Sequence, residues 1–144
     1  MDVTEAFDEL FEAATAAARN AYAPYSRFRV GAAVRTAAGK VHLGCNVENV
    51  AFPVGICAER AALAQAVLVE GARLDVRLIE IVALDASGTV LPCAPCGGCR
   101  QAILELAPRA RVRFRNATGR VVERSANQLL PEAFDFETAP APLA

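Results

Sequence analysis

The sequence predicts a single α/β domain in which helices are layered against one open sheet. Its 144 residues suffice for one ordinary domain and are too few for two domains with substantial cores. Helical and strand patterns alternate along the chain instead of falling into separate blocks, which is typical of layered α/β domains. We find no internal repeat that would indicate a solenoid or an array.

The chain begins with a predicted amphipathic helix. Asp2 and Glu5 have the spacing of a capping box, which marks a helix N-terminus. Apolar residues then recur every three or four positions, as on one helix face, and these are Phe7, Leu10, Phe11, Ala14 and Ala18. We expect this helix to run to about Asn20, because Pro24 follows shortly afterwards.

A β-hairpin is predicted over residues 27–46. Apolar residues alternate with others on both sides of the Ala38-Gly39 turn, which is the pattern of two paired strands. His42, the only histidine, has the opposite strand parity to Cys45 and its apolar neighbours. We therefore expect His42 on the surface of the hairpin, and Cys45 in the interior as a small hydrophobic residue.

Helices and strands alternate again through the rest of the chain. The sequence predicts a helix over 58–70 closed by Gly71, a strand over 75–84, a helix from Pro95 to Leu106, strands over 111–116 and 120–124, and a short helix capped by Ser125 and Gln128. The segment 109–115 places arginine at every second position, so one face of that strand is basic. We expect a solvated face there, or one that meets acidic residues across a subunit contact.

Composition narrows the class of protein. With 15 basic and 16 acidic residues and a net charge of -1, the chain lacks the positive charge that favours binding to nucleic acid. No basic, apolar leader or membrane-length apolar run is present, so we expect a cytoplasmic protein with no membrane partner. Its 54% hydrophobic content and mean hydropathy of +0.28 are high for a small monomer and favour self-association.

The five cysteines are best interpreted as reduced thiols or metal ligands, since their number is odd and no export signal precedes them. Three lie in the segment LPCAPCGGCRQ, residues 91–101, in two overlapping Cys-x-x-Cys spacings. Pro95 separates Cys93 from Cys96 and Cys99, which then share one face of a helix N-terminus. The pair expected to bind metal is therefore Cys96 with Cys99.

A third thiol, Cys57, also stands at a predicted helix start. Three protein ligands would leave one tetrahedral position of a zinc ion open to water, as in catalytic sites, and such water titrates near about pH 7. Glu59 follows Cys57 by two residues and would carry the proton. Because residues two apart do not share a helix face, this requires Cys57 to lie at or before the first turn.

Two motifs join these residues: Cys57-Ala58-Glu59-Arg60 and Pro95-Cys96-Gly97-Gly98-Cys99. Together they resemble the signature of zinc nucleoside deaminases. The segments AYAPYSRFRVGAAV, GCNVENVAFPVGICAER, PCGGCRQ and NQLLPEAF resemble, in this order, the cytidine deaminases of the short, homotetrameric type. The resemblance covers most of the chain, from residue 21 to 134.

The resemblance implies a three-layer α-β-α sandwich with a central mixed sheet of about five strands. The domain would span residues 1–136, with a flexible C-terminal tail over 137–144. The implied reaction is hydrolytic deamination of cytidine and 2'-deoxycytidine in pyrimidine salvage. One zinc ion per subunit would be held by Cys57, Cys96 and Cys99, with hydroxide attacking C4 and Glu59 as the proton shuttle.

Further site residues follow from the same resemblance. Asn46 and Glu48 would hold the sugar hydroxyls, since residues two apart in an extended stretch project to one side. Phe28 would line the nucleoside pocket and Ala58 would offer backbone contacts to the base. Phe134 would stack on the pyrimidine in a neighbouring subunit's site, so that a tetramer would share its sites.

Arg60 has a predicted role beside the metal. Three thiolates on one dication leave a formal charge of -1, and a guanidinium bonded to ligand sulfur would offset it. One departure from the family pattern stands nearby: many relatives carry Tyr where this chain carries Phe52.

Three alternatives stay open from the sequence. A closed structural zinc would take Cys45, Cys93 or His42 as its fourth ligand. A related deaminase would act on a modified aminopyrimidine nucleoside such as blasticidin S. A zinc-stabilised binding module would retain pyrimidine nucleosides without turning them over.

Overall fold

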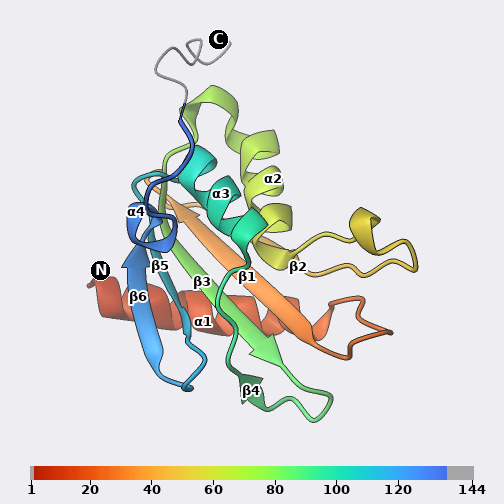
Figure 1. Cartoon of the computed structure of the whole chain (residues 1–144). Coiled ribbons are helices and arrows are strands. Elements are labelled where there is room, and N and C mark those ends of the chain that lie inside the picture. The colour runs from red at the N-terminus through yellow and green to blue at the C-terminus, as the bar shows by residue number, and fades with distance from the viewer. Residues whose placement is uncertain (1, 136–144) are drawn as a thin grey trace.

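The computed structural model describes residues 2–135, which form one mixed sheet with helices on both faces (Figure 1). The predicted tail over 137–144 lies outside the described residues. The strands are β1 (Arg29–Thr36), β2 (Val41–Cys45), β3 (Val76–Leu84), β4 (Val90–Leu91), β5 (Arg111–Arg115) and β6 (Val121–Ser125). The helices are α1 (Val3–Arg19), α2 (Ala58–Glu70), α3 (Gly97–Leu106) and α4 (Ala126–Leu129), with short 3-10 helices at Phe52–Val54 and Gly71–Arg73.

The sheet is mixed because one of its pairings is parallel. Its order is β2-β1-β3-β5-β6, and β4 pairs with β3 beside this path. The pairing of β3 with β5 is parallel, and the other pairings are antiparallel. The connection between β3 and β5 carries α3, as parallel neighbours require a long crossover. The predicted mixed sheet of about five strands is confirmed.

Two hydrophobic clusters lie on opposite faces of the sheet. On one face, the front, α2, α3 and α4 pack against residues of β1, β3 and β5. On the back, α1 packs against the alternate residues of β1 and β3. Figure 1 shows α1 crossing behind the strands while α2 and α3 lie before them. The three-layer α-β-α arrangement is therefore confirmed.

Two glycines allow helices to approach the sheet closely, one on each face. A Cβ at Gly31 would lie 1.9 Å from the Ala14 carbonyl oxygen of α1. A Cβ at Gly44 would lie 2.3 Å from the Ala58 carbonyl oxygen at the start of α2. Any larger residue at either position would push a helix off the sheet. Gly44 thereby fixes the N-terminal turn of α2 against β2.

The prediction that His42 lies on the surface is wrong. Its side chain is 5% exposed and its Nε2 lies 2.8 Å from Glu70 Oε1 near the end of α2. Thr36 donates to the same carboxylate oxygen at 2.9 Å. His42 and Gly44 face α2, whereas Val41 and Leu43 on the other side of β2 are each 40% exposed. The error arose because β2 is an edge strand whose front face is covered and whose apolar back residues stay partly exposed.

The capping residues gave one correct and one wrong prediction. The Ser125 hydroxyl accepts a hydrogen bond from the backbone N–H of Gln128, and the Gln128 side-chain oxygen accepts one from the backbone N–H of Ser125, so the predicted capping box is confirmed. Asp2 occupies the N-cap position of α1, but its side chain makes no capping hydrogen bond. The first helix therefore begins where predicted without the predicted cap, and packing against the sheet stabilises it.

The basic face of β5 is only partly solvated. Arg113 lies on the back of the sheet with a side chain 15% exposed, and its Nε is 2.5 Å from Glu80 Oε2 on β3. Its Nη2 donates to the Phe7 carbonyl oxygen at 2.7 Å, and its guanidinium lies 4.7 Å from the centre of the Phe7 ring. The prediction of a solvated face is wrong for Arg113, because α1 covers that part of the strand.

Within residues 2–135, no helix combines the length and the apolar character needed to cross a membrane.

Candidate metal centre and active-site pocket

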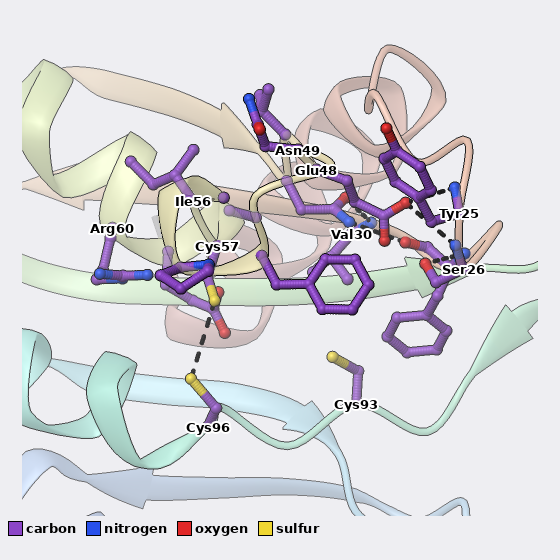
Figure 2. A pocket seen from close by; sticks show the side chains of 18 of the residues that line it. Tyr25, Ser26, Val30, Glu48, Asn49, Ile56, Cys57, Arg60, Cys93 and Cys96 are labelled. Carbon is purple, nitrogen blue, oxygen red and sulfur yellow. Dashed lines mark hydrogen bonds between the residues drawn. The ribbon is translucent and has the colours of Figure 1, made fainter.

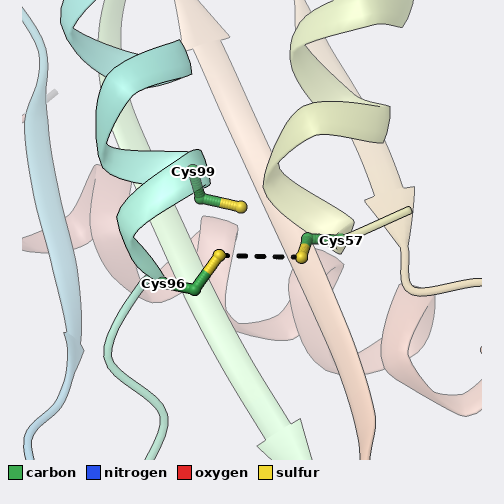
Figure 3. A group of neighbouring side chains, drawn as sticks. All are labelled: Cys57, Cys96 and Cys99. Carbon is green, nitrogen blue, oxygen red and sulfur yellow. Dashed lines mark hydrogen bonds between the residues drawn. The ribbon is translucent and has the colours of Figure 1, made fainter. Parts of the chain in front are cut away.

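Three thiols meet where two helices begin. Cys57 is the N-cap of α2 and Cys96 is the N-cap of α3, while Cys99 lies in the first turn of α3. Their sulfur atoms all lie within 4.8 Å of one another, and those of Cys57 and Cys96 are 3.8 Å apart. Figure 3 shows the three side chains converging from the two helix ends. The structure thus brings together the three predicted ligands from segments about 40 residues apart.

The surroundings of Cys57 favour its thiolate. A hydrogen bond from Cys99, followed by hydrogen bonds from Arg60 and Cys96, lowers the pKa of Cys57 to about 5. The same shared proton and burial raise the pKa of Cys99. Because these thiols already share protons at hydrogen-bonding distances, a cation placed among them would displace protons from sulfur.

The donor set fits zinc with one open coordination position. Thiolate sulfur is a preferred zinc ligand, and structural sites are closed by four protein ligands. Within the described part of the chain the group contains Cys57, Cys96 and Cys99 and no fourth His, Cys, Asp or Glu. His42 is engaged with Glu70, and Cys45 and Cys93 stand outside the group. The arrangement is therefore that of a catalytic site and argues against closed structural zinc.

Glu59 is buried beside these thiols. Its side chain is 4% exposed, and its Oε2 accepts a hydrogen bond from the Cys99 thiol at 3.5 Å. Burial raises the pKa of Glu59, and the charge on Cys57 adds to the effect. Cys57 precedes α2 as its N-cap, as the sequence analysis requires for Glu59 to reach the same site. Glu59 lies in the first turn of the helix, so its side chain can point towards the thiols. A carboxyl with a raised pKa is suited to carry protons near neutral pH.

A pocket of about 1000 Å³ opens beside the thiols (Figure 2). It is bounded by the segment before β1, the segment after β2, the start of α2 and the loop before α3. Its metal end contains Cys57, Glu59 and Cys96, and its other end carries Ser26, Asn46, Glu48 and Asn49. A cavity of this size and mixed polarity suits a small polar molecule with one ring.

Asn46 and Glu48 both line the pocket, and both already make contacts within the chain. Asn46 accepts from the Val30 N–H at 2.7 Å and donates to the Phe28 carbonyl oxygen at 2.9 Å. Glu48 Oε1 accepts from the backbone N–H groups of Tyr25 and Ser26 at 2.9 and 3.1 Å. Hydrogen bonds from Ser26, above all, lower the pKa of Glu48. The pair therefore holds the pocket wall in shape.

The aromatic residues divide between the pocket and a separate surface. Phe28 lines the pocket, as does the fully buried Ala58. Phe52 stands at the rim with its ring 6.3 Å from that of Tyr25, edge to face. Phe134 is 75% exposed and lies in a different groove, beside Gln101 and Leu104 of α3. It takes no part in the pocket of its own chain.

The sequence predicts no pocket role for Tyr25, Ser26 or Cys93, yet all three line the pocket. Tyr25 and Ser26 anchor Glu48 through their backbone N–H groups. The sequence predicts a helix break in their segment, AYAPYSRFRVGAAV, and a family resemblance, but not this contact. The sequence offers Cys93 only as an alternative fourth ligand of a closed zinc site, yet it lines the pocket. The Pro24 break and the Cys-x-x-Cys spacing were the available signals, but neither indicates which way a side chain points.

Comparisons with known proteins agree with this geometry. The model of the family described as "Cytidine and deoxycytidylate deaminase zinc-binding region" matches residues 4–114. A cytidine deaminase of Halalkalibacterium halodurans is 43% identical over 129 residues, covering 89% of this chain and 93% of that protein. One of Mycobacterium tuberculosis is 40% identical over 127 residues, covering 88% of each.

Solved structures give the same result. The crystal structure of a cytidine deaminase from Burkholderia pseudomallei is similar with a TM-score of 0.76 and 46% identity, covering 88% of this chain and 98% of that one. That of the Mycobacterium tuberculosis enzyme has a TM-score of 0.73 and 36% identity, covering 94% of this chain and all of that one, 100%.

Proposed function

Because the chain belongs to the cytidine and deoxycytidylate deaminase family, we propose that it hydrolyses cytidine and 2'-deoxycytidine to uridine and 2'-deoxyuridine, releasing ammonia. The observation that carries this function is the meeting of three thiols and one buried carboxyl at the end of a pocket. Zinc is the cofactor, one ion per subunit, and when bound it supplies the Lewis acidity that makes water nucleophilic at neutral pH.

Glu59 moves the protons of the reaction. It accepts a proton from the attacking water and delivers it to N3 of the pyrimidine, which makes C4 electrophilic. The same carboxyl later donates a proton to the departing amine, so that ammonia leaves as a neutral molecule. Its burial and raised pKa support this role, because a group that gives and takes protons works best when its pKa is near the working pH.

Arg60 moderates the charge of the thiolate cluster. Its hydrogen bond to Cys57 raises the pKa of Arg60 and holds its cation beside the sulfur atoms. Three thiolates around a dication have a formal charge of -1, and the guanidinium offsets it. The contact also fixes the position of Cys57 at the start of α2.

The polar end of the pocket holds the sugar. Glu48 faces the pocket with a carboxylate fixed by two backbone N–H groups, and such an acceptor suits the sugar hydroxyls. Asn46 shapes the same wall and offers its amide to the sugar. Phe28 packs against the nucleoside, and the backbone at Ala58 contacts the base. These assignments belong to one domain over residues 1–136.

The enzyme works as a homotetramer in the cytoplasm, in pyrimidine salvage. Large apolar side chains remain exposed on the described chain, including Val50, Phe52, Val54, Leu68 and Phe134, and this supports self-association. Phe134 stands outside the pocket of its own chain, which supports its role in stacking on the base in a neighbouring subunit's site. Sites shared in this way would lose activity when subunits separate.

The test pairs a metal assay with a turnover assay on one preparation. Adding the purified protein to cytidine should remove the cytidine ultraviolet band and release one ammonia per uridine formed. Blasticidin S, measured beside cytidine, separates the related enzyme that acts on modified nucleosides. Zinc-replete protein that leaves the cytidine spectrum unchanged would refute the proposal.

The shared site has its own measurement. Dilution until the subunits separate should abolish turnover, and Phe134→Ala should raise KM while zinc content is kept. Full activity in a separated monomer would exclude a contribution from the neighbouring subunit.

A further inference from the structure

Cys93 occupies a fixed position in the pocket wall. It belongs to the loop between β4 and α3, and its backbone N–H donates to the Arg115 carbonyl oxygen of β5 at 2.9 Å. Its side chain is half-buried, lines the pocket, and packs against the front hydrophobic cluster. Figure 2 shows its sulfur projecting from this loop into the pocket. The loop backbone is thus anchored to β5 at the point where Cys93 enters the pocket wall.

Cys93 stands near the metal end without belonging to the metal centre. It lines the same pocket as Glu59, Cys57 and Cys96. Burial raises the pKa of Cys93 to about 12. Its sulfur stands outside the group of three ligands. Cys93 therefore presents a small, neutral, largely apolar surface to whatever fills that end of the pocket.

The proposed reaction fixes which edge of the base meets this surface. C4 must face the metal centre and N3 must face Glu59, while N1 carries the sugar towards Asn46 and Glu48. N3 and C5 flank C4 on opposite sides of the ring. Because Glu59 approaches from the start of α2, C5 must face the opposite wall, which is the loop that leads to Cys96.

We propose that Cys93 forms the wall that faces C5 of the pyrimidine, and that its small side chain sets how large a C5 substituent the enzyme accepts. This inference rests on the proposed function, since it uses the orientation that deamination at C4 requires. A sulfur atom fills less space than a branched aliphatic side chain, so a C5 methyl group has room that a larger residue would remove.

The test compares cytidine with 5-methylcytidine, which is hydrolysed to 5-methyluridine and ammonia. The measured quantity is the ratio of kcat/KM for the two substrates in the wild type, Cys93→Ala and Cys93→Leu. Cys93→Leu should lower the 5-methylcytidine to cytidine ratio about tenfold or more, since one methylene in a tight pocket changes selectivity by roughly 10- to 200-fold. Cys93→Ala should raise that ratio. A ratio that stays at the wild-type value in both variants would overturn the inference.

Two controls separate this result from damage to the site. Cys45→Ala removes a half-buried thiol outside the pocket and should leave the ratio unchanged. Adding Glu59→Gln to each Cys93 variant allows the dissociation constants of the two nucleosides to be measured calorimetrically without turnover. Cys93→Leu should weaken the binding of 5-methylcytidine relative to cytidine, and Cys93→Ala should strengthen it. Zinc content is measured throughout. Protein that turns over neither nucleoside fails the proposed function, whereas normal cytidine turnover with an unchanged ratio fails only the assignment of Cys93.

Discussion

Two buried glutamates on opposite faces of the sheet, Glu59 and Glu80, have different surroundings. On the back, Glu80 of β3 is 3% exposed and is paired with Arg113. On the front, Glu59 of α2 is 4% exposed, and among the described residues it forms no ion pair. Burial raises the pKa of both carboxyls, that of Glu80 to about 7. These two carboxyls are thus similarly buried, but Glu80 contacts a guanidinium whereas Glu59 contacts the Cys99 thiol.

The difference separates a structural carboxylate from a chemical one. A buried charge is tolerated when it is paired and hydrogen-bonded, and Glu80 meets that condition while joining β3, β5 and α1 through Arg113. Glu59 instead lies beside three thiols and an open pocket, where a substrate can reach it. The front face therefore holds a carboxyl that a substrate can reach, and the back face holds one that is paired with Arg113 away from the pocket.

Removing a metal ligand on the front face should have the largest effect on activity. Cys57→Ala is expected to lose zinc and all measurable cytidine turnover, since two thiols are too few to hold a catalytic zinc ion. Cys45→Ala, a thiol at the end of β2 outside the cluster, is the matched control and should keep both. Metal analysis by mass spectrometry with turnover on the same sample decides the outcome. Full zinc occupancy in Cys57→Ala would show that the ligands are different ones.

The two glutamates should respond in opposite ways to the same change. Glu59→Gln is expected to lower kcat by about 10² to 10⁴, because the proton carrier is lost while zinc is retained. Its thermal midpoint should not fall, since no ion pair is broken. Glu80→Gln should lower the thermal midpoint and keep kcat at temperatures well below unfolding. A large fall of kcat in Glu80→Gln would show that the two faces are not independent.

Replacing Arg113, the partner of Glu80, should make the stability of the fold depend on pH. Arg113→Met leaves Glu80 buried without its cation and should destabilise the fold by about 3–5 kcal/mol at pH 8. Loss of the opposing cation raises the pKa of Glu80 further above its ordinary value of 4.5. The folded state then binds a proton that the unfolded state has lost, so stability falls as pH rises through this window.

The free energy of unfolding that Arg113→Met removes should therefore be smaller at pH 5 than at pH 8. Urea unfolding at several pH values measures it, with Arg111→Met as the control because Arg111 is half-exposed and pairs with Glu123 at the surface. A penalty that does not depend on pH would mean that Glu80 keeps its charge in the variant.

The sequence predicted the metal centre better than the rest of the molecule, for a physical reason. Cys96 and Cys99 have a short spacing at one predicted helix start, and Cys57 stands at another, so residue types and helix signals were enough to propose the ligand set. The alternation of helix and strand patterns is read from short segments, so the layered fold also followed. What a side chain meets across the sheet depends on distant segments, which the pattern of one strand does not contain.

His42 and Arg113 illustrate that limit. The parity of β2 was interpreted from its apolar residues, but the covered face is the one where Gly44 admits α2 and His42 meets Glu70. The sequence predicts that Arg113 belongs to a solvated basic face, but in the structure α1 covers this residue. In both cases a helix far away in the sequence decided which face of a strand is buried.

Gly31 and Gly44, where α1 and α2 approach the sheet closely, allow the smallest expected difference between the two faces to be tested. Gly31→Ala and Gly44→Ala each place a Cβ into helix backbone and should each destabilise the fold by about 1–3 kcal/mol or more. They should differ at the active site. Gly44 meets the Ala58 carbonyl oxygen next to Cys57 and Glu59, whereas Gly31 meets Ala14 and Ala18 in the C-terminal half of α1. Zinc affinity and kcat should therefore fall in Gly44→Ala and be kept in Gly31→Ala.

Comparison at matched stability makes this distinction clear. Each variant is assayed at the same interval below its own thermal midpoint, so that loss of folded protein cannot account for lost turnover. A competing chelator then measures zinc affinity in both. If the two variants lost zinc equally, displacement of α1 would be transmitted through the sheet to α2, and the front and back faces would behave as one mechanical unit. Loss confined to Gly44→Ala would show that the start of α2 alone positions the ligand and the proton carrier.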